Sequence, residues 1–341
     1  MARRESHHED GHAHGHKHDG LAHQHAHGPA DPTILTSERG IWAVKWSLVG
    51  LAATAVLQLV VVFFTGSVAL LADTIHNFGD AATAFPLWVA FALARRAPSR
   101  RFTYGYGRVE DLAGGAVVLT ILFSALVAGY ESIQRLMYPQ TVQHLWAVIL
   151  ASVVGFLGNE AVALLRIRVG KEIGSAALVA DGYHARVDGL TSLAVLVGAV
   201  GVWMGFPLAD PVIGLVITLM ILRIVWESGS AVFTRLLDGV DPEVIEEIGR
   251  TVRQVPEVRD VGDVRARWIG HRLHAEVNLA VSPLLSVADG HELSVEARHR
   301  LLHGLKYLSN ATIHIDPMTA SGEAHHGVEN HSHGGLGPHS H

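Results

Sequence analysis

The sequence predicts an α-helical polytopic membrane protein, with a bundle of six transmembrane helices followed by a small α+β domain. Hydrophobic residues make up 49% of the chain and charged residues only 17%, whereas soluble domains carry about a quarter charged residues. Almost all the long apolar runs lie between Ile41 and Phe233, and the residues that follow have the mixed composition of a soluble domain. The composition therefore excludes a purely soluble protein.

Six segments are apolar and long enough to cross about 30 Å of hydrocarbon. They cover residues 41–64, 67–94, 110–134, 145–166, 175–202 and 209–233. Lysine and arginine gather in the N-terminal arm, in the connections after the second and fourth segments, and after Phe233. The positive-inside rule assigns these parts to the cytoplasm, and an even number of spans agrees with two cytoplasmic termini. We expect a multi-pass protein of a bacterial cytoplasmic (inner) membrane, because the chain is compact and shows no targeting segment.

The region after the sixth segment alternates between helix and strand patterns. Residues 241–255 begin with Asp and Pro and continue with apolar residues at helical spacing, which predicts a soluble amphipathic helix. Residues 264–281 predict two strands joined at Gly270, and a second helix and a final strand follow. The order αββαβ predicts a ferredoxin-like cytosolic domain with its helices on one face of the sheet. The expected boundaries are a disordered His-rich arm at 1–34, the bundle at 35–236, the cytosolic domain at 237–317 and a disordered His-rich tail at 318–341.

One nine-residue pattern, A-D-x-x-H-x-x-x-D, occurs twice, at residues 72–80 in the second segment and at 180–188 in the fifth. A charged side chain inside a bilayer costs roughly 2.5–3.5 kcal/mol, so these polar groups need a compensating partner. Residues four apart on a helix have Cβ atoms about 5–6 Å apart, and both side chains can therefore reach one ion. Two imidazoles and two carboxylates suit tetrahedral Zn²⁺. The predicted metal ligands are His76, Asp80, His184 and Asp188.

The first aspartates of the two copies, Asp73 and Asp181, are not predicted as ligands. They either orient the histidines through hydrogen bonds or contribute to the packing of the helices. A single copy of the pattern would suit a polar packing cluster or a proton relay equally well. The repeat of the pattern in two segments favours a metal site.

Other classes of function fit the residues less well. An intramembrane metallohydrolase needs a general base beside its metal, typically in an H-E-x-x-H motif, and the sequence lacks that motif. The sequence also lacks an ATP-binding motif, so we predict neither an enzyme nor a nucleotide partner. Without cysteine, any metal must be held by His, Asp and Glu. A membrane zinc sensor that signals through its cytosolic domain remains the alternative to a transporter.

The combination of motifs resembles the cation diffusion facilitator family, in its zinc-transporting form. The resemblance rests on six spans, the two H-x-x-x-D pairs, G-Y-G-R-V-E at 105–110, Asp210-Pro211 and I-H-I-D-P at 313–317. It covers roughly residues 35–317. It implies a homodimer in the lipid bilayer that exports divalent cations, preferably Zn²⁺, in exchange for H⁺ by alternating access. It implies no nucleic-acid partner. The four predicted ligands match the family's transport site.

Other family positions are matched only in part. A second metal site of some relatives would fall on Ser99, Phe102 and Tyr106, which are poor zinc ligands, so we predict that this site is absent. Arg108 and Asp238 match the two partners of a charge interlock between the third span and the end of the sixth.

The resemblance also implies a possible metal site in the cytosolic domain. His291, His314 and Asp316 match its ligand positions, whereas a strand histidine expected near Asn278 is missing and His274 lies close by in the sequence. The alternative is that these histidines are ordinary surface or interface residues.

Histidine-rich arms occur at both ends of the sequence. Residues 7–27 contain nine histidines and residues 325–341 contain six. With so few apolar residues neither arm can bury a core, so both are predicted to be disordered. They either collect metal ions near the cytosolic entrance or are inert tails.

Overall fold

The structure is a computed structural model that describes residues 32–65, 84–138, 145–206 and 208–320. Five helices of the described part are long and apolar enough to cross a membrane. They are α1 (Pro32–Thr65), α3 (Arg108–Met137), α4 (Leu145–Ile173), α5 (Ala176–Trp203) and α6 (Ala209–Leu236). Of the predicted second span, residues 84–94 form a short apolar helix, and its first part lies outside the described residues. The chain is therefore a polytopic α-helical membrane protein, as predicted.

Two of the helices run well beyond the ends of the predicted apolar segments. Helix α1 begins at Pro32, within the residues that the sequence assigned to the arm, and not at residue 41. Proline is well suited to the first turn of a helix because its missing N–H would have no partner there. Helix α4 continues to Ile173, so the basic residues after residue 165 belong to a helix and not to a loop. Apolar runs mark the lipid-covered part of a helix but not its polar extensions.

Helices α4 and α5 form a tight antiparallel hairpin. Gly174 takes a left-handed φ of +74° at the turn, a conformation that only glycine adopts readily. Ser175 caps α5, and its hydroxyl accepts a hydrogen bond from the Leu178 backbone N–H at 3.1 Å. At Gly182 an added Cβ would lie 2.7 Å from the Ile167 side chain. The missing side chain therefore lets α4 approach α5 closely beside the second copy of the repeated pattern.

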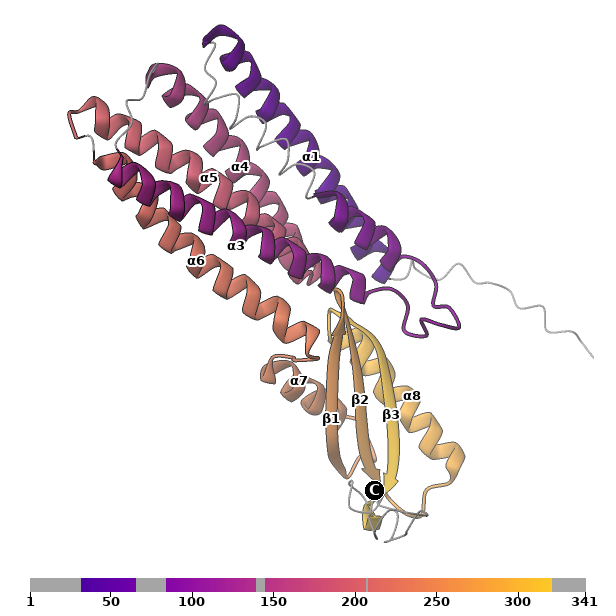
Figure 1. The fold of residues 1–341 in the computed structure, drawn as a ribbon. Coiled ribbons are helices and arrows are strands. Elements are labelled where there is room, and N and C mark those ends of the chain that lie inside the picture. Colours follow the sequence, from indigo (N-terminus) through magenta and orange to yellow (C-terminus); the bar gives the residue numbers. More distant parts are fainter. Residues whose placement is uncertain (1–31, 66–83, 139–144, 207, 321–341) are drawn as a thin grey trace, which may run out of the picture. The chain divides into compact units, whose positions relative to one another are not determined.

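Helices α3 and α6 pack beside α5 in the same bundle (Figure 1). Their shared core contains small and branched apolar residues, namely Val117, Ile121, Ala125, Ala180, Val187, Ala194, Ile217, Ile221 and Val232. Many large apolar side chains on the other faces of these helices are exposed. Such exposed apolar faces are what a bilayer would cover.

The α+β domain has the predicted order αββαβ. Its elements are α7 (Pro242–Arg253), β1 (Asp260–Ile269), β2 (Arg272–Val281), α8 (Val287–Gly304) and β3 (Leu308–Pro317), followed by the short helix η1 (Met318–Ala320). Strand β1 pairs antiparallel with β2 across the turn at Gly270, and β2 pairs parallel with β3. One face of the sheet packs on α7 and α8 around Ile248, Leu279 and Leu301. The alternation of apolar and polar residues in the strands therefore predicted this sheet correctly.

Candidate functional site

The described half of the repeated pattern lies on α5. His184 and Asp188 are buried on one side of this helix, with side-chain exposures of 1% and 9%. The imidazole Nδ1 lies 4.0 Å from Oδ1 of Asp188. Two ligands bound tetrahedrally to one Zn²⁺ lie roughly 3.3 Å apart, given bonds of about 2.0–2.1 Å. A small adjustment of the two side chains would therefore let both hold one ion.

The first copy, with His76, Asp80 and Asp73, lies outside the described residues. Two members of the predicted four-ligand set are thus described. Across the described parts of the chain, no group of three or more His, Asp or Glu side chains is placed to hold a metal ion. The four-ligand site remains a prediction from the repeat.

Asp181 is paired with an arginine on the neighbouring helix α4. Its Oδ2 lies 3.0 Å from Nη1 of Arg166 on α4, and the two side chains are 0% and 1% exposed. Nη1 of Arg166 donates to the backbone carbonyl of Asp181 at 3.5 Å, and neither carboxylate oxygen of Asp181 has a hydrogen-bond partner within the described parts. The ion pair joins α4 to α5, and both roles left open for Asp181 stay predictions. Arg166, which the sequence placed in a basic connection, is a buried member of the bundle.

The turn between β1 and β2 contacts the start of α3 through a buried acid–base pair. Nδ1 of His271 lies 2.6 Å from Oε2 of Glu110, and both side chains are at most 2% exposed. The backbone N–H of Gly270 donates to Oδ2 of Asp111 at 3.1 Å. The hydroxyl of Ser37 on α1 lies 3.3 Å from Nε2 of the same histidine. No motif in the sequence pointed to His271, because it stands alone in a turn.

Arg108 and Asp238 form an ion pair, with Nη2 of the guanidinium against Oδ1 of the carboxylate. Nη1 of Arg108 also donates to the backbone carbonyl of Arg235 at 2.9 Å. Arg235 in turn donates to the Gly174 carbonyl at 2.6 Å and lies 4.2 Å over the ring of Trp268 in β1. The two residues of the expected interlock thus meet within a wider network of arginine contacts.

The cytosolic-domain candidates come together only in part. Nε2 of His314 lies 2.9 Å from Oδ1 of Asp316, which is buried. His291 lies on the exposed side of α8, and it does not join them in a three-residue metal group within the described chain. Asn278 is the β2 partner of His314 in the sheet register.

The connection between residues 95 and 107 is held by local hydrogen bonds. The Ser99 hydroxyl accepts from the backbone N–H of Phe102 at 3.1 Å and from the Tyr106 hydroxyl at 3.4 Å. These are the three positions at which some relatives would carry a metal site. Here they stabilise a turn.

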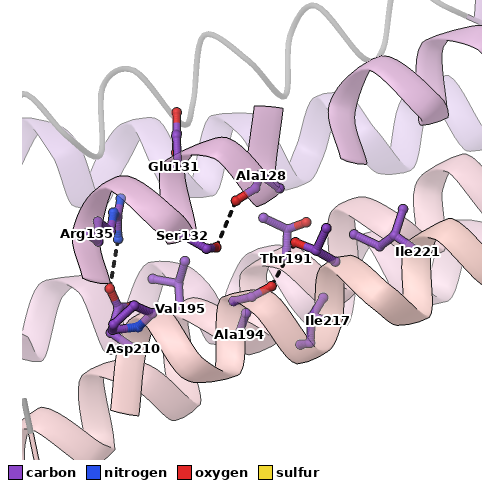
Figure 2. A pocket seen from close by; sticks show the side chains of 13 residues that line it. Ala128, Glu131, Ser132, Arg135, Thr191, Ala194, Val195, Asp210, Ile217 and Ile221 are labelled. Atoms are coloured by element: carbon purple, nitrogen blue, oxygen red, sulfur yellow. Dashed lines mark hydrogen bonds and ion pairs between the residues drawn. The ribbon is translucent and has the colours of Figure 1, made fainter. Parts of the chain in front are cut away.

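A small cavity of about 80 Å³ opens between α3, α5 and α6, at the end of the bundle where α6 begins (Figure 2). Its polar lining is Glu131, Ser132, Arg135, Thr191, Asp210 and Thr218. Nη1 of Arg135 lies 3.1 Å from Oδ2 of Asp210, and both residues line the cavity. The sequence predicted that Asp210-Pro211 begins the sixth span. The pairing of Asp210 with Arg135 was not predicted.

Comparison with known proteins gives matches along most of the chain. Residues 44–237 match the cation efflux transmembrane domain, and residues 240–318 match the cation efflux protein cytoplasmic domain. The probable cation efflux system protein MT2084 of Mycobacterium tuberculosis is 55% identical over 287 residues, which cover 84% of this chain and 86% of that protein. The magnetosome protein MamB of Paramagnetospirillum magneticum is 24% identical over 83% of this chain and 95% of its own length. The bundle, the αββαβ domain and these matches lead to one conclusion: the chain belongs to the cation efflux, or cation diffusion facilitator, family.

Proposed function

We propose that the protein is a zinc-preferring efflux transporter that moves Zn²⁺ out of the cytosol in exchange for protons. The observation that carries this proposal is the buried His184–Asp188 pair on α5, one of two copies of the same pattern in two spans. Membership in the cation efflux family supports the transport of divalent cations. The mixed nitrogen and oxygen donors favour zinc over magnesium, calcium and manganese, which prefer oxygen ligands alone.

The proposed mechanism is alternating access around the four-ligand site. Zn²⁺ binds His76, Asp80, His184 and Asp188 when the site faces the cytosol. Protons compete with zinc for the imidazole nitrogens and carboxylates, so protonation from the outer side weakens the site and releases the ion. Rocking of the spans returns the protonated site to the cytosolic side, where the proton is lost.

The orientation and the assembly also belong to the proposal. The distribution of Lys and Arg puts both termini and the α+β domain in the cytoplasm of a bacterial cell. The match of residues 240–318 to the family's cytoplasmic domain supports this orientation and assembly as a homodimer. His291, His314 and Asp316 are the residues of that domain that would bind a regulatory metal ion.

Zinc uptake into proteoliposomes under an imposed pH gradient tests the proposal. The wild-type chain is compared with Asp188→Ala and with Glu227→Ala, a matched control in which an exposed acid of α6 is removed. We expect gradient-dependent uptake in the wild type and the control, and background uptake in Asp188→Ala. Replacing Zn²⁺ with Mn²⁺ in the same assay should reduce uptake.

Each other outcome contradicts one part of the proposal. Zinc binding without flux would favour the membrane sensor. Equal flux in Asp188→Ala and the wild type would place the transport site elsewhere. Flux that ignores the pH gradient would remove proton exchange, and equal uptake of both metals would remove the zinc preference.

A further inference from the structure

A single stripe of α5 connects the transport-site pair to the cavity. His184, Asp188, Thr191 and Val195 follow one another at spacings of four, three and four, which places them on one face of the helix. Thr191 and Val195 line the cavity. Given a rise of about 1.5 Å per residue, the cavity begins roughly 5 Å along the helix from Asp188. An ion that leaves Asp188 toward the start of α6 therefore meets this cavity next.

The cavity offers oxygen groups to a cation. Thr191 comes from α5 and Asp210 from the first turn of α6, whereas the Glu131 side chain of α3 points away from these residues (Figure 2). A volume of about 80 Å³ has room for several water molecules, since each needs roughly 10–15 Å³. A partly hydrated divalent ion would fit the chemistry of the lining.

The Arg135–Asp210 ion pair borders this cavity. The Asp210 carboxylate is 18% exposed and the Arg135 side chain 46%. Asp210 packs directly on α5, because a Cβ added at Gly198 would lie 2.6 Å from its Oδ1. The guanidinium between α3 and α6 repels an approaching cation, and the ion pair holds the ends of these two helices together.

Arg135 also has a second carboxylate within reach. Glu131 precedes it by four residues on α3, and residues at this spacing lie on the same face of a helix and can pair. A rotation of the Arg135 side chain from Asp210 to Glu131 would clear the cavity and leave Asp210 available. The local sequence therefore provides two positions for one guanidinium.

We propose that the Arg135–Asp210 ion pair is the release-side gate of the transport path. The pair is closed in this structure. A cation that arrives from Asp188 binds the Asp210 carboxylate. Arg135 then pairs with Glu131 instead, which opens the path out of the cavity. The direction of this movement rests on the proposed efflux function, whereas the gate itself rests on the cavity and the ion pair.

Thiol labelling tests the gate without measuring transport. The chain has no cysteine, so a single Thr191→Cys change gives a unique probe inside the cavity. A membrane-impermeant thiol reagent is applied to the outside of intact bacterial cells that express the chain. We expect slow labelling of Thr191→Cys, and roughly fivefold faster labelling when Arg135→Gln or Asp210→Asn is added, the factor expected for breaking a partly exposed ion pair.

Three controls separate the gate from general loosening of the bundle. Arg223→Gln breaks an exposed ion pair with Glu227 elsewhere on α6, and it should leave the labelling rate unchanged. Phe206→Cys, an exposed position in the α5–α6 connection, should label rapidly in every background. The charge swap Arg135→Asp with Asp210→Arg restores an ion pair of reversed direction and should return labelling toward the slow rate.

The outcomes distinguish this gate from the proposed function. Equal labelling of Thr191→Cys with and without the ion pair would overturn the gate, even if wild-type zinc flux is observed. Faster labelling in both single variants together with no wild-type flux would support the gate and contradict transport. Failure of Phe206→Cys to label from outside would contradict the assignment of this end to the release side.

Discussion

The two ends of the helix bundle are held together in different ways. At the end where α6 leads into the α+β domain, the Arg166–Asp181 ion pair and the contact between Glu110 and His271 are almost completely buried. At the opposite end, the Arg135–Asp210 pair is partly exposed and borders a cavity. Buried charges are strongly coupled to their partners, whereas exposed pairs contribute about 0–1 kcal/mol. The end where α6 begins should therefore open more easily than the end beside the α+β domain.

This difference predicts that the two ends of the bundle open at different costs in free energy. Movement of the helices at the release end disturbs one ion pair and a small polar cavity. Movement at the other end would separate α4 from α5 at a buried ion pair and pull the Gly270 turn away from Asp111, whose carboxylate accepts its N–H. The α+β domain contacts the end that is expected to be harder to open.

The largest effect is expected from breaking the Arg166–Asp181 pair. Arg166→Met should lower the free energy of unfolding by about 3–5 kcal/mol, because it leaves the Asp181 carboxylate buried without a compensating charge. Thermal unfolding of the purified protein in detergent would measure the change. Arg135→Gln is the matched control from the release end and should cost less than about 1 kcal/mol.

The double variant Arg166→Met with Asp181→Leu sharpens this test. Replacing both members of a buried ion pair with apolar residues of similar size is often neutral or stabilising. Most of the loss seen in the single variant should therefore be recovered. If the two single variants Arg166→Met and Arg135→Gln cost the same, the proposed difference between the ends is wrong.

A smaller effect is expected at the Glu110–His271 pair. Glu110→Ala removes a buried acceptor from the imidazole and should cost about 1–3 kcal/mol, the range for a buried polar group left without its partner. Glu110→Gln keeps a polar group beside Nδ1 and should cost less. Hydrogen exchange of the β1–β2 turn would show whether the turn leaves α3. Unchanged protection in Glu110→Ala would mean that this pair does not hold the turn in place.

Apolar runs and strand alternation predicted five of the six spans and the αββαβ order, because both patterns record which faces avoid water. The ion pairs were harder to predict than the helices and strands, since they join residues far apart in the sequence. Arg166 and Asp181 could have been predicted: they lie almost symmetrically about Gly174, so a helical hairpin with its turn there brings them together. Because Asp181 lies within a predicted span, its carboxylate was expected to need a compensating partner.

The pairs Arg135–Asp210 and Glu110–His271 could not be predicted in this way. Each joins elements that are separated by at least one other helix in the chain, and their contact depends on how those elements pack. An arginine near a helix end reads as an ordinary boundary charge of a membrane span. The sequence alone therefore identified the candidate ligands of α5 but not the residues that would control access to them.

The smallest effect is a pH dependence in the α+β domain, which contrasts with the buried pairs because His274 is only half-buried. Burial lowers the pKa of His274 from its ordinary value of 6.5, and the positive charges of Arg267 and Arg272 lower it further. Glu276, which pairs with Arg267 at 3.2 Å, faces the same region. The unfolded chain then takes up this proton at a higher pH than the folded chain does.

Stability from His274 is therefore present above about pH 6.5 and is lost as the pH falls through its lowered folded pKa. His274→Asn should flatten this part of the stability profile, measured by calorimetry of the full chain in detergent. Arg267→Gln removes one source of repulsion and should move the transition toward the ordinary histidine range. A profile that is the same in the wild type and His274→Asn would show that another group causes the acid sensitivity. Since solvent screens a half-buried ring, both changes should be smaller than those at the buried pairs of the bundle.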